Sequence, residues 1–437
     1  MNSFLKKLFC WYQANARDFP FRRTKDPYLI WLSEIIMQQT RIEQGVPYYD
    51  KFVRVFPGVY DLAGASEEDV LKQWQGLGYY SRARNLHSTA NEIVEKYAGR
   101  FPETYEGLRS LKGVGDYTAA AIASVCFGLP HPVADGNVIR FITRHFGITG
   151  PVDKAGVKKE IMDVLTKLMG DVSGFVGSSS ATELMRPTVA RIFTPPLRSR
   201  FAEPDAACVK CFAPIKPSQG GDPASGTDAA DLPTNPATSN FATSLLRHFA
   251  TYTGPGLFNQ AMIEFGAMYC IPRNPDCKAC IFANSCYALK HTMVGQLPVK
   301  KQQQALKQRY FNYLVISVKG SDGLYFGKRS GNDIWKGLYE FKLIETKEAV
   351  SPQKLKSSPE WKKLFGRSAV DIVSHTGDII HILSHQKIIT RFYKLEIKKP
   401  SETFGMLVQA EKIPGLPIAR IIEKYFEMYP LVGYSME

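Results

Sequence analysis

Two carboxylates in contrasting surroundings are the first residues of this 437-residue sequence that could do chemistry. Glu34 is the one acid in residues 28–40, a helix-like stretch rich in large apolar side chains. Because burial disfavours the charged form of a carboxyl, we expect the pKa of Glu34 to rise toward neutrality, which suits a general acid. The alternative is a structural role, in which Glu34 is buried and paired with an arginine such as Arg22.

The second carboxylate, Asp135, directly precedes a helix-like run that starts at Val138. This position is typical of an N-cap, which stabilises a helix by about 1 kcal/mol. A carboxylate that faces a sugar can also stabilise an oxocarbenium-like centre, or attack it, as in glycoside hydrolysis. One embedded acid and one carboxylate at a helix start are what an acid and electrostatic-stabiliser pair requires.

A glycine-containing hairpin lies between the two carboxylates, in residues 111–119. Gly113 and Gly115 would permit positive φ and the close approach of a phosphate, and the helix that follows would present unpaired N–H groups. Such a helix-hairpin-helix motif contacts the nucleic-acid backbone and does not read bases. A single GxG turn is weak evidence, but the net charge of +14, from 55 Lys and Arg against 41 Asp and Glu, also suits a polyanionic partner.

Four cysteines form a C-x6-C-x2-C-x5-C cluster, made of Cys270, Cys277, Cys280 and Cys286. Four thiolates within seventeen residues can hold one metal ion or one metal cluster. Structural zinc sites usually have two paired CxxC knuckles, and ferredoxin spacings also differ, so neither is favoured. Cys208 and Cys211 form a separate CxxC pair without further ligands nearby, and metal binding there is not favoured.

The elements that must position these residues are helices. Apolar residues recur at helical spacing from about residue 28 to residue 168, and again from about residue 241 to the cysteines. We therefore predict a mainly helical domain from residues 1–170 and 241–290. Its interruption, residues 171–240, is predicted to be a disordered insertion, because its second half lacks aromatic residues and offers too little apolar surface to offset ordering entropy.

The last third of the chain changes to strand-like alternation. Residues 291–309 are expected to form a basic linker, and residues 310–437 an α+β domain, with strand-like runs at 310–318, 323–329 and 390–397 and a helix at 418–429. The sequence has no apolar stretch of membrane-spanning length and begins with an amphipathic pattern that lacks a signal-peptide core. A cytoplasmic, intracellular protein without membrane contact is expected.

Together these motifs resemble a known family. Residues 31–41, residues 76–87, the hairpin, Asp135, residues 258–268 and the four cysteines are similar to the MutY-type adenine DNA glycosylases of the endonuclease III, or helix-hairpin-helix, superfamily. The resemblance covers nearly everything except residues 171–240. It implies a helix-hairpin-helix glycosylase domain whose four cysteines hold a [4Fe-4S] cluster, followed by a Nudix-like domain.

The resemblance also implies a reaction. Members of this family act in base excision repair and excise adenine opposite 8-oxoguanine or guanine in duplex DNA. By position, Glu34 would protonate adenine N7, Asp135 would stabilise the sugar cation, and Tyr117 and Asn137 would support them. Superfamily members that also cut the strand have a Schiff-base lysine where this chain has Tyr117, and a phenol cannot form that imine. A monofunctional glycosylase, or one with at most weak strand cleavage, is therefore expected. The protein is also expected to be a monomer.

The DNA contacts implied by the resemblance are spread over the sequence. Gln39 and Tyr79 would wedge into the duplex, and Thr40 would hydrogen-bond the partner base, while Ser384 and His385 match the family's lesion-sensing Phe-Ser-His loop. Leu383 replaces the phenylalanine of that loop, and no run of Arg and Glu typical of Nudix hydrolysis is present. The complete set of expected DNA-binding residues is Arg22, Gln39, Thr40, Tyr79, Gly113, Gly115, Ser384 and His385.

Two other functions remain as alternatives. A bifunctional, endonuclease III-like glycosylase and lyase shares the hairpin and the cysteines, but it would need lysine at position 117. A non-enzymatic iron–sulfur DNA-binding protein accounts for the charge and the cysteines, but leaves Glu34 and Asp135 without a purpose.

Overall fold

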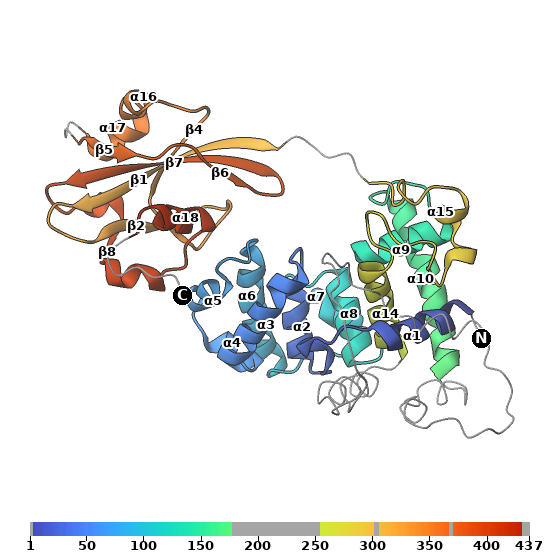
Figure 1. Cartoon of the computed structure of the whole chain (residues 1–437). Coiled ribbons are helices and arrows are strands. Elements are labelled where there is room, and N and C mark those ends of the chain that lie inside the picture. The colour runs from blue at the N-terminus through green and yellow to red at the C-terminus, as the bar shows by residue number, and fades with distance from the viewer. Residues whose placement is uncertain (1–2, 177–253, 301–305, 367–369, 431–437) are drawn as a thin grey trace, which may run out of the picture. The chain divides into compact units, whose positions relative to one another are not determined.

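The computed structural model describes residues 3–176, 254–300, 306–366 and 370–430 (Figure 1). The chain divides into two compact units, one of residues 1–38 and 100–301 and the other of residues 39–99 and 302–437. Residues 39–99, which the sequence groups with the first domain, therefore cluster with the C-terminal residues. Most of the predicted insertion, including Cys208 and Cys211, lies outside the described residues. No described helix is long and apolar enough to cross a membrane.

The first unit is built mainly from helices in its described part. They are α1 (Ser3–Asn15), the 3-10 helix η1 (Pro20–Arg22), α2 (Pro27–Met37), α7 (Tyr105–Ser110), α8 (Asp116–Cys126), α9 (Gly136–Phe146), α10 (Ala155–Val176), α14 (Gly254–Met268), η4 (Ala283–Ser285) and α15 (Tyr287–Lys290).

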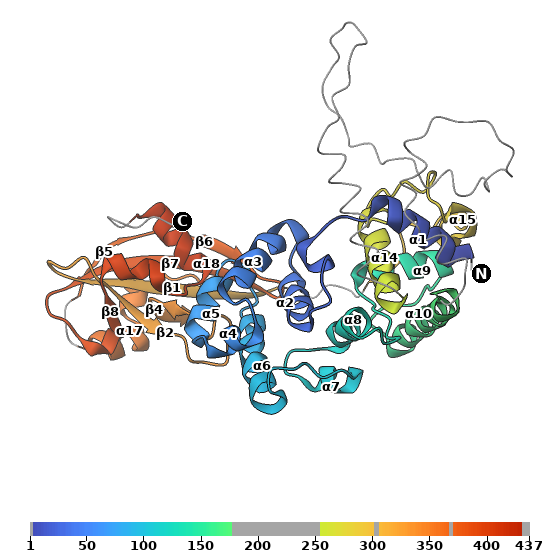
Figure 2. The same ribbon diagram turned by 90° about the horizontal axis from the view of Figure 1, so that it is seen from below.

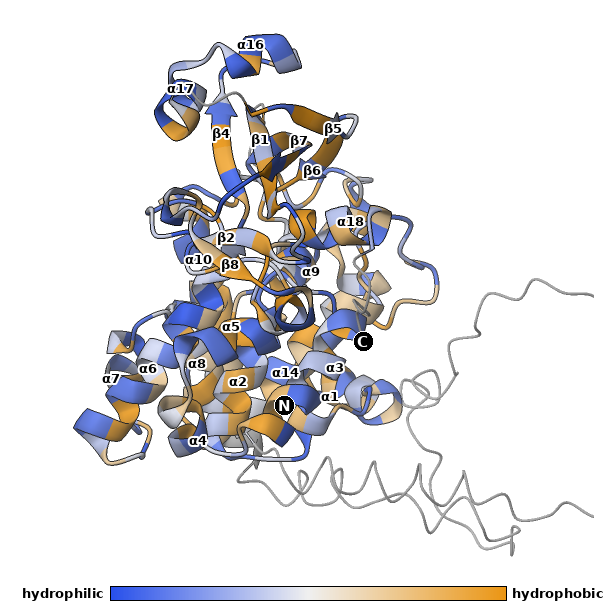
Figure 3. Cartoon of the chain, turned by 90° about the vertical axis from the view of Figure 1, so that its left-hand side faces the viewer, coloured by the Kyte–Doolittle hydropathy of each residue, from blue (hydrophilic) through white to orange (hydrophobic). Residues whose placement is uncertain are grey.

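Hydrophobic faces hold this unit together. Helix α1 buries Leu5, Leu8 and Trp11, as its amphipathic sequence predicts. Helix α8 is buried on all sides from Thr118 to Val125 and packs against α2, α7 and α14, so it is the central helix. Figure 3 shows hydrophobic and hydrophilic stripes on many of the other helices.

Helix α10 is longer than the sequence predicts. It continues to Val176, six residues into the segment interpreted as an insertion. The reason is that Val172, fully buried, continues the apolar face that Leu165 and Leu168 begin.

The second unit combines helices with a sheet. Its helices are α3 (Ile42–Val55), α4 (Val59–Gly64), α5 (Glu67–Trp74), α6 (Ser81–Tyr97), α16 (Pro352–Lys356), α17 (Pro359–Phe365), η5 (Glu402–Phe404), η6 (Ala410–Gly415) and α18 (Arg420–Met428). Its strands are β1 (Lys307–Val318), β2 (Leu324–Lys328), β3 (Tyr339–Glu340), β4 (Lys342–Thr346), β5 (Ile372–His375), β6 (Ile379–Ile382), β7 (Gln386–Ile397) and β8 (Met406–Val408).

The two long strands β1 and β7 form the centre of the sheet. They run parallel and side by side, from Lys307 opposite Gln386 to Val318 opposite Ile397 (Figures 1 and 2). The described strands follow the order β3-β2-β1-β7-β5, and β4, β6 and β8 add antiparallel pairs to β1, β7 and β2. This pairing extends β1 back to Lys307, so the last three residues of the predicted linker belong to the sheet.

Each face of the central strands is covered. On one face Leu314, Ile316 and Leu395 form a core with Trp361 and Phe365 of α17. On the other face Phe392 packs against Tyr425 of α18, with ring centroids 4.7 Å apart. The predicted fold class, a helical domain followed by an α+β domain, is confirmed, whereas the Nudix-like topology stays a prediction.

Candidate active site

Glu34 lies in the last turn and a half of α2. The helix begins with Asp26, whose carboxylate accepts a hydrogen bond from Tyr28 N at 2.8 Å, and with Pro27 in the first turn. Its C-terminal half buries Ile35 and Ile36, the two residues that follow the glutamate. The helix packs on α8, which carries Tyr117.

Burial raises the pKa of Glu34 from its ordinary 4.5 to about 7. A hydrogen bond with Tyr117 opposes this effect, the negative charge of Asp135 adds to it, and the positive charge of Arg22 opposes it. Glu34 can therefore hold a proton at a pH where an ordinary glutamate is ionised. This is the direction that the sequence predicts from a lone acid among apolar side chains.

Asp135 is both the N-cap of α9 and a member of the same site. Its Oδ1 accepts hydrogen bonds from Asn137 N at 2.9 Å and Val138 N at 2.7 Å, and its Oδ2 accepts one from Asn137 Nδ2 at 2.7 Å. Burial raises the pKa of Asp135, although these hydrogen bonds and Arg140 lower it. Asp135 therefore caps α9 and also belongs to the candidate catalytic group.

Tyr117, near the start of α8, connects the two acids. Burial raises the pKa of its phenol well above 10, and the charges of Glu34 and Asp135 raise it further. Since the phenol stays protonated, it is a hydrogen-bond donor to Glu34. The structure thus brings Glu34, Tyr117 and Asp135 together, which is the arrangement that acid and electrostatic catalysis on one substrate needs.

Asn137 links this site to the cysteine loop through Arg140, a residue that the sequence analysis missed. Arg140 Nη2 donates to Asn137 Oδ1 at 2.9 Å and to Gly266 O at 2.5 Å, and its Nε donates to Cys270 O at 2.7 Å. One turn later, Arg144 Nη1 donates to Ile271 O at 2.8 Å. The spacing of four residues, which places both arginines on one face of the helix, is the signal that could have identified them.

The side chain of Arg22 is buried, whereas a direct contact with a DNA phosphate requires an exposed side chain. Its side chain is 4% exposed, and its Nη2 forms an ion pair with Glu264 at 2.6 Å, beside a second pair from Arg17 Nε at 2.7 Å. Although burial alone would raise it, the pKa of Glu264 falls to about 2 because of the two arginines. Arg22 is therefore part of a buried ion-pair group, and its predicted contact with DNA needs correction.

The hairpin departs from its prediction at one glycine. Gly113 has a φ of +77°, but Gly115 has a φ of −89° and is the N-cap of α8. Only Gly113 therefore needs the left-handed freedom of glycine, because the N-cap position has an extended backbone. Both glycines are exposed, as a contact with a phosphate requires.

The predicted wedge residues lie in the second unit and have unusual backbones. Gln39 has a φ of +56° and Tyr79 a φ of +47°, values that non-glycine residues rarely adopt. Arg82 ties their loops together, since its Nη1 donates to Thr40 Oγ1 at 3.2 Å and its Nη2 donates to Gly78 O at 3.2 Å. The ring of Tyr79 is 43% exposed and therefore accessible to a duplex.

Ser384 and His385 form the tip of the β6–β7 hairpin. Both are exposed, and Ser384 Oγ lies 3.1 Å from His385 Nδ1. A hydrogen bond from Leu383 N to Gln386 O at 2.8 Å closes the turn. Leu383, in the place of the family's phenylalanine, is half-buried.

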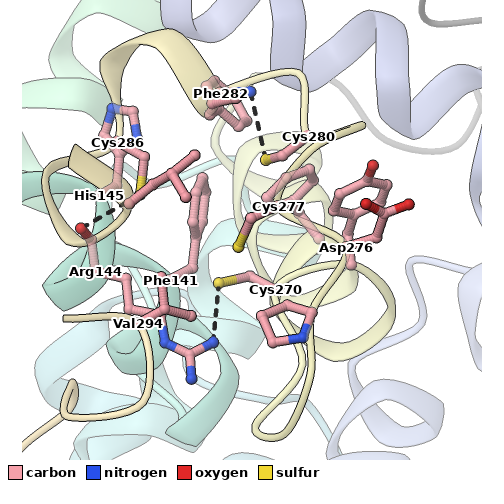
Figure 4. A pocket seen from close by; sticks show the side chains of 15 residues that line it. Phe141, Arg144, His145, Cys270, Asp276, Cys277, Cys280, Phe282, Cys286 and Val294 are labelled. Atoms are coloured by element: carbon pink, nitrogen blue, oxygen red, sulfur yellow. Dashed lines mark hydrogen bonds between the residues drawn. The ribbon is translucent and has the colours of Figure 1, made fainter. Parts of the chain in front are cut away.

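The four cysteines of the cluster line one cavity in the first unit (Figure 4). Arg144 Nη1 donates to Cys270 Sγ at 3.5 Å, Phe282 N donates to Cys280 Sγ at 3.4 Å, and Cys286 Sγ donates to Arg144 O at 3.6 Å. Aromatic side chains, including Phe141 and Phe265, cover the cavity.

The chemistry of these side chains suits a bound metal group. Four thiols are ligands that both a structural zinc ion and an iron–sulfur cluster accept. Four cysteines around one wider cavity, with N–H donors aimed at their sulfurs, suit a polynuclear iron–sulfur group.

Comparisons with known proteins find relatives of this chain. Residues 32–167 match the HhH-GPD superfamily base excision DNA repair protein family. The adenine DNA glycosylase of Buchnera aphidicola subsp. Schizaphis graminum is 24% identical, over 98% of both chains. The adenine DNA glycosylase of Homo sapiens is 27% identical, over 98% of this chain and 74% of its own. A solved thermostable thymine-DNA glycosylase is 21% identical, covers 66% of this chain and 95% of its own, and has a TM-score of 0.42.

The match to the family includes Glu34, the hairpin, Tyr117 and Asp135, and the adenine DNA glycosylases that align with this chain extend over its C-terminal part as well. Over residues 32–167, the chain is therefore similar to the HhH-GPD superfamily of base excision DNA repair proteins.

Proposed function

We propose that this protein is a monofunctional adenine DNA glycosylase, which hydrolyses the N-glycosidic bond of adenine opposite 8-oxoguanine or guanine in duplex DNA. We further propose that it acts as a monomer inside the cell. The observation that carries the proposal is the half-buried group of Glu34, Tyr117 and Asp135, in which the pKa of Glu34 is raised to about 7. The curated relatives named adenine DNA glycosylase support the choice of base.

The proposed reaction uses the two carboxyls in opposite protonation states. Protonated Glu34 donates its proton to adenine N7, the bond between N9 and C1′ breaks, and the electron pair leaves with the base. Asp135, ionised and held by three hydrogen bonds, stabilises the positive charge that develops at C1′. Water then adds to C1′ and gives one proton to the Glu34 carboxylate, which restores the acid. Tyr117 and Asn137 keep the two carboxyls in place.

Tyr117 also supports the monofunctional assignment. Strand cleavage by this superfamily needs an amine that forms an imine with the sugar, and a phenol cannot do so. The lysine of the hairpin, Lys112, is exposed and lies outside the acid group. We therefore infer that the product is an intact strand with an abasic site.

DNA binding is assigned to the exposed residues around these elements. Gly113 and Gly115 would approach the phosphate backbone, Gln39 and Tyr79 would fill the gap left by the extruded adenine, and Thr40 would contact the partner base. Base extrusion costs a few kcal/mol, which such wedging side chains offset. Ser384 and His385 would recognise 8-oxoguanine.

Cys270, Cys277, Cys280 and Cys286 would hold a [4Fe-4S] cluster. When bound, the cluster would act as a structural clamp that orders the loop of residues 270–286. The chain's own contribution is Arg144, which donates to a cysteine sulfur and to two backbone carbonyls of that loop. Arg273 and Lys278 of the same loop would then face phosphate.

The test is base release from three duplexes, containing adenine opposite 8-oxoguanine, adenine opposite guanine, and thymine glycol. We expect free adenine from the first two, no product from the third, and no strand scission without alkali. Glu34→Gln is expected to abolish adenine release while duplex binding persists. A protein that releases no adenine from either mispair, or that cleaves the strand at thymine glycol, would contradict the proposal.

A further inference from the structure

Trp335 has a backbone conformation that its residue type does not explain. Its φ is +59°, and for a non-glycine residue such a conformation costs on the order of 1–3 kcal/mol. It belongs to residues 329–338, the loop that connects β2 to β3 and that we call the bracing loop. The loop is well ordered by its own hydrogen bonds, including Leu338 N to Trp335 O at 3.0 Å and Gly337 N to Arg329 O at 2.7 Å. A strained residue in a hydrogen-bonded loop suggests that its side chain makes a contact needed for function.

The side chain of Trp335 packs against the hairpin that carries Ser384 and His385. Its ring centroid is 5.7 Å from that of His381 on β6, with an interplanar angle of 64°, and 6.0 Å from that of Phe311 on β1. Such edge-to-face pairs stabilise a structure beyond the apolar area that they bury. His381 lies three residues before Ser384, so Trp335 supports the first arm of the hairpin.

A second contact supports the other arm. Arg309 Nη1 donates to Asp333 Oδ1 of the bracing loop at 2.9 Å and to Gln386 Oε1 at 3.2 Å. Gln386 is the first residue of β7 and directly follows His385. In addition, Lys307 N donates to His385 O at 3.3 Å. The bracing loop therefore contacts the first arm of the hairpin directly through Trp335, and it is linked to the second arm through Arg309 of β1.

The opposite side of the bracing loop is fixed to helices α5 and α6. Arg84 Nη1 donates to Lys336 O at 2.7 Å. Gly337, with a φ of +85°, lies so close to α5 that a Cβ there would be 3.0 Å from Leu71 Cδ1. At the ends of the loop, Lys328 Nζ and Tyr339 Oη both contact Glu68 Oε2, at 3.1 Å and 3.2 Å. Helices α5 and α6 flank Tyr79, the predicted wedge residue.

We propose that Trp335 is a positioning residue for recognition of the base opposite adenine. It holds the Ser384–His385 tip, through His381, in a fixed place relative to helices α5 and α6. The inference rests on the proposed function and deepens it. 8-Oxoguanine differs from guanine only at O8 and N7, so discrimination depends on a few hydrogen bonds. A missed hydrogen bond of this kind costs about 1–3 kcal/mol, and the tip must be held closely to make it.

The test compares single-turnover adenine release from duplexes with adenine opposite 8-oxoguanine and adenine opposite guanine, using the full chain. In Trp335→Leu we expect the ratio of the two rates to fall by about tenfold, the effect of one lost hydrogen bond, while the rate opposite guanine stays within about twofold. Trp335→Phe, which keeps a ring edge for His381, should recover most of the ratio. Arg84→Met, which releases the loop from α6, should lower the ratio in the same direction.

Trp361→Leu is the matched control, because Trp361 is buried in the core on the opposite face of the sheet. It is expected to lower the melting temperature without changing the ratio. The inference is overturned if Trp335→Leu keeps the wild-type ratio, if it slows both substrates equally, if Trp361→Leu loses the ratio as well, or if the wild-type protein prefers neither duplex. Failure of the proposed function is a different result, in which the wild-type protein releases adenine from neither duplex.

Discussion

At the scale of single residues, the candidate site depends on two carboxyls whose pKa values are both raised by burial but whose hydrogen-bond partners differ. Burial raises the pKa of Glu34 to about 7, and the hydrogen bond with Tyr117 opposes this rise only in part. Asp135 accepts three hydrogen bonds that favour its charged form. The direction of the Glu34 shift could be predicted from the sequence, because burial of a lone acid is its main cause. The partner of Arg22 could not, because Glu264 is distant in the sequence.

The pH dependence of adenine release should follow Glu34. Since the acid must be protonated and its pKa is about 7, the single-turnover rate should fall as the pH rises through 7. Tyr117→Phe removes a hydrogen bond that lowers the pKa of Glu34, so the falling limb should move to higher pH. A pH–rate profile of both proteins checks this. An unmoved limb in the variant, or a limb displaced to lower pH, would contradict the assignment of Glu34 as the acid.

Glu34 should lower the free energy of unfolding at alkaline pH. A folded-state pKa above the unfolded value means that the folded protein binds the proton more tightly, so this contribution is present below about pH 4.5 and is lost as the pH rises through 7. Glu34→Gln removes the charge and should therefore stabilise the protein at pH 8, by up to about 3 kcal/mol from the pKa difference. Thermal unfolding at pH 8 and pH 5 measures the gain, which should nearly vanish at pH 5. An equal gain at both pH values would show that the charge of Glu34 is not responsible.

At the scale of elements, helix α9 connects the acid site with the cysteine loop. Asp135 caps its start, Asn137 follows in the first turn, and Arg140 and Arg144 contact the loop of residues 270–286. The helix and its cap could be predicted from local sequence. The loop contacts could not, because they join residues more than 120 positions apart. The positive φ values of Gln39, Tyr79 and Trp335 were also beyond prediction, since local preference opposes them.

Gly266 of α14 allows this helix to approach the start of α9. A Cβ at Gly266 would lie 2.4 Å from Asn137 O, so Gly266→Ala should push Asn137 and Asp135 out of place. We expect adenine release to fall by more than about tenfold, while duplex binding changes little. Single-turnover rates and binding titrations measure the two effects.

Gly170→Ala is the matched control for this change. Gly170 is also inside a helix, but a Cβ there has nothing within 4 Å. It should stabilise the protein by roughly 0.5–1 kcal/mol, as alanine does in helices, without slowing adenine release. A Gly266→Ala protein as active as the Gly170→Ala protein would show that the approach of α14 to α9 does not position the acid.

At the scale of the whole molecule, local pattern predicted the two kinds of architecture but not how the chain groups them. Residues 39–99 have the same helical pattern as their neighbours, yet they cluster with the sheet domain. Their link is made by side chains whose partners lie far along the chain. Gln75 contacts Glu423 and accepts a hydrogen bond from Ile418 N at 3.4 Å, and Lys72 Nζ donates to Leu416 O at 3.3 Å. The hydrophobic periodicity of the sequence does not predict such pairs.

The cysteine cavity should couple cofactor content to the stability of the first unit and to catalysis. Cys280→Ala removes one of four proposed ligands, so we expect loss of iron, sulfide and visible absorption, together with a lower melting temperature. Arg140 donates to both Cys270 O and Asn137 Oδ1. Loss of order in the loop of residues 270–286 should therefore disturb Asn137 and slow adenine release by the DNA-bound enzyme. Cys126→Ala is the control, since Cys126 is a free thiol outside the cavity. If Cys280→Ala keeps its iron and colour, the proposed ligand set is wrong; if it loses them but retains full activity, the cavity has no influence on the acid site.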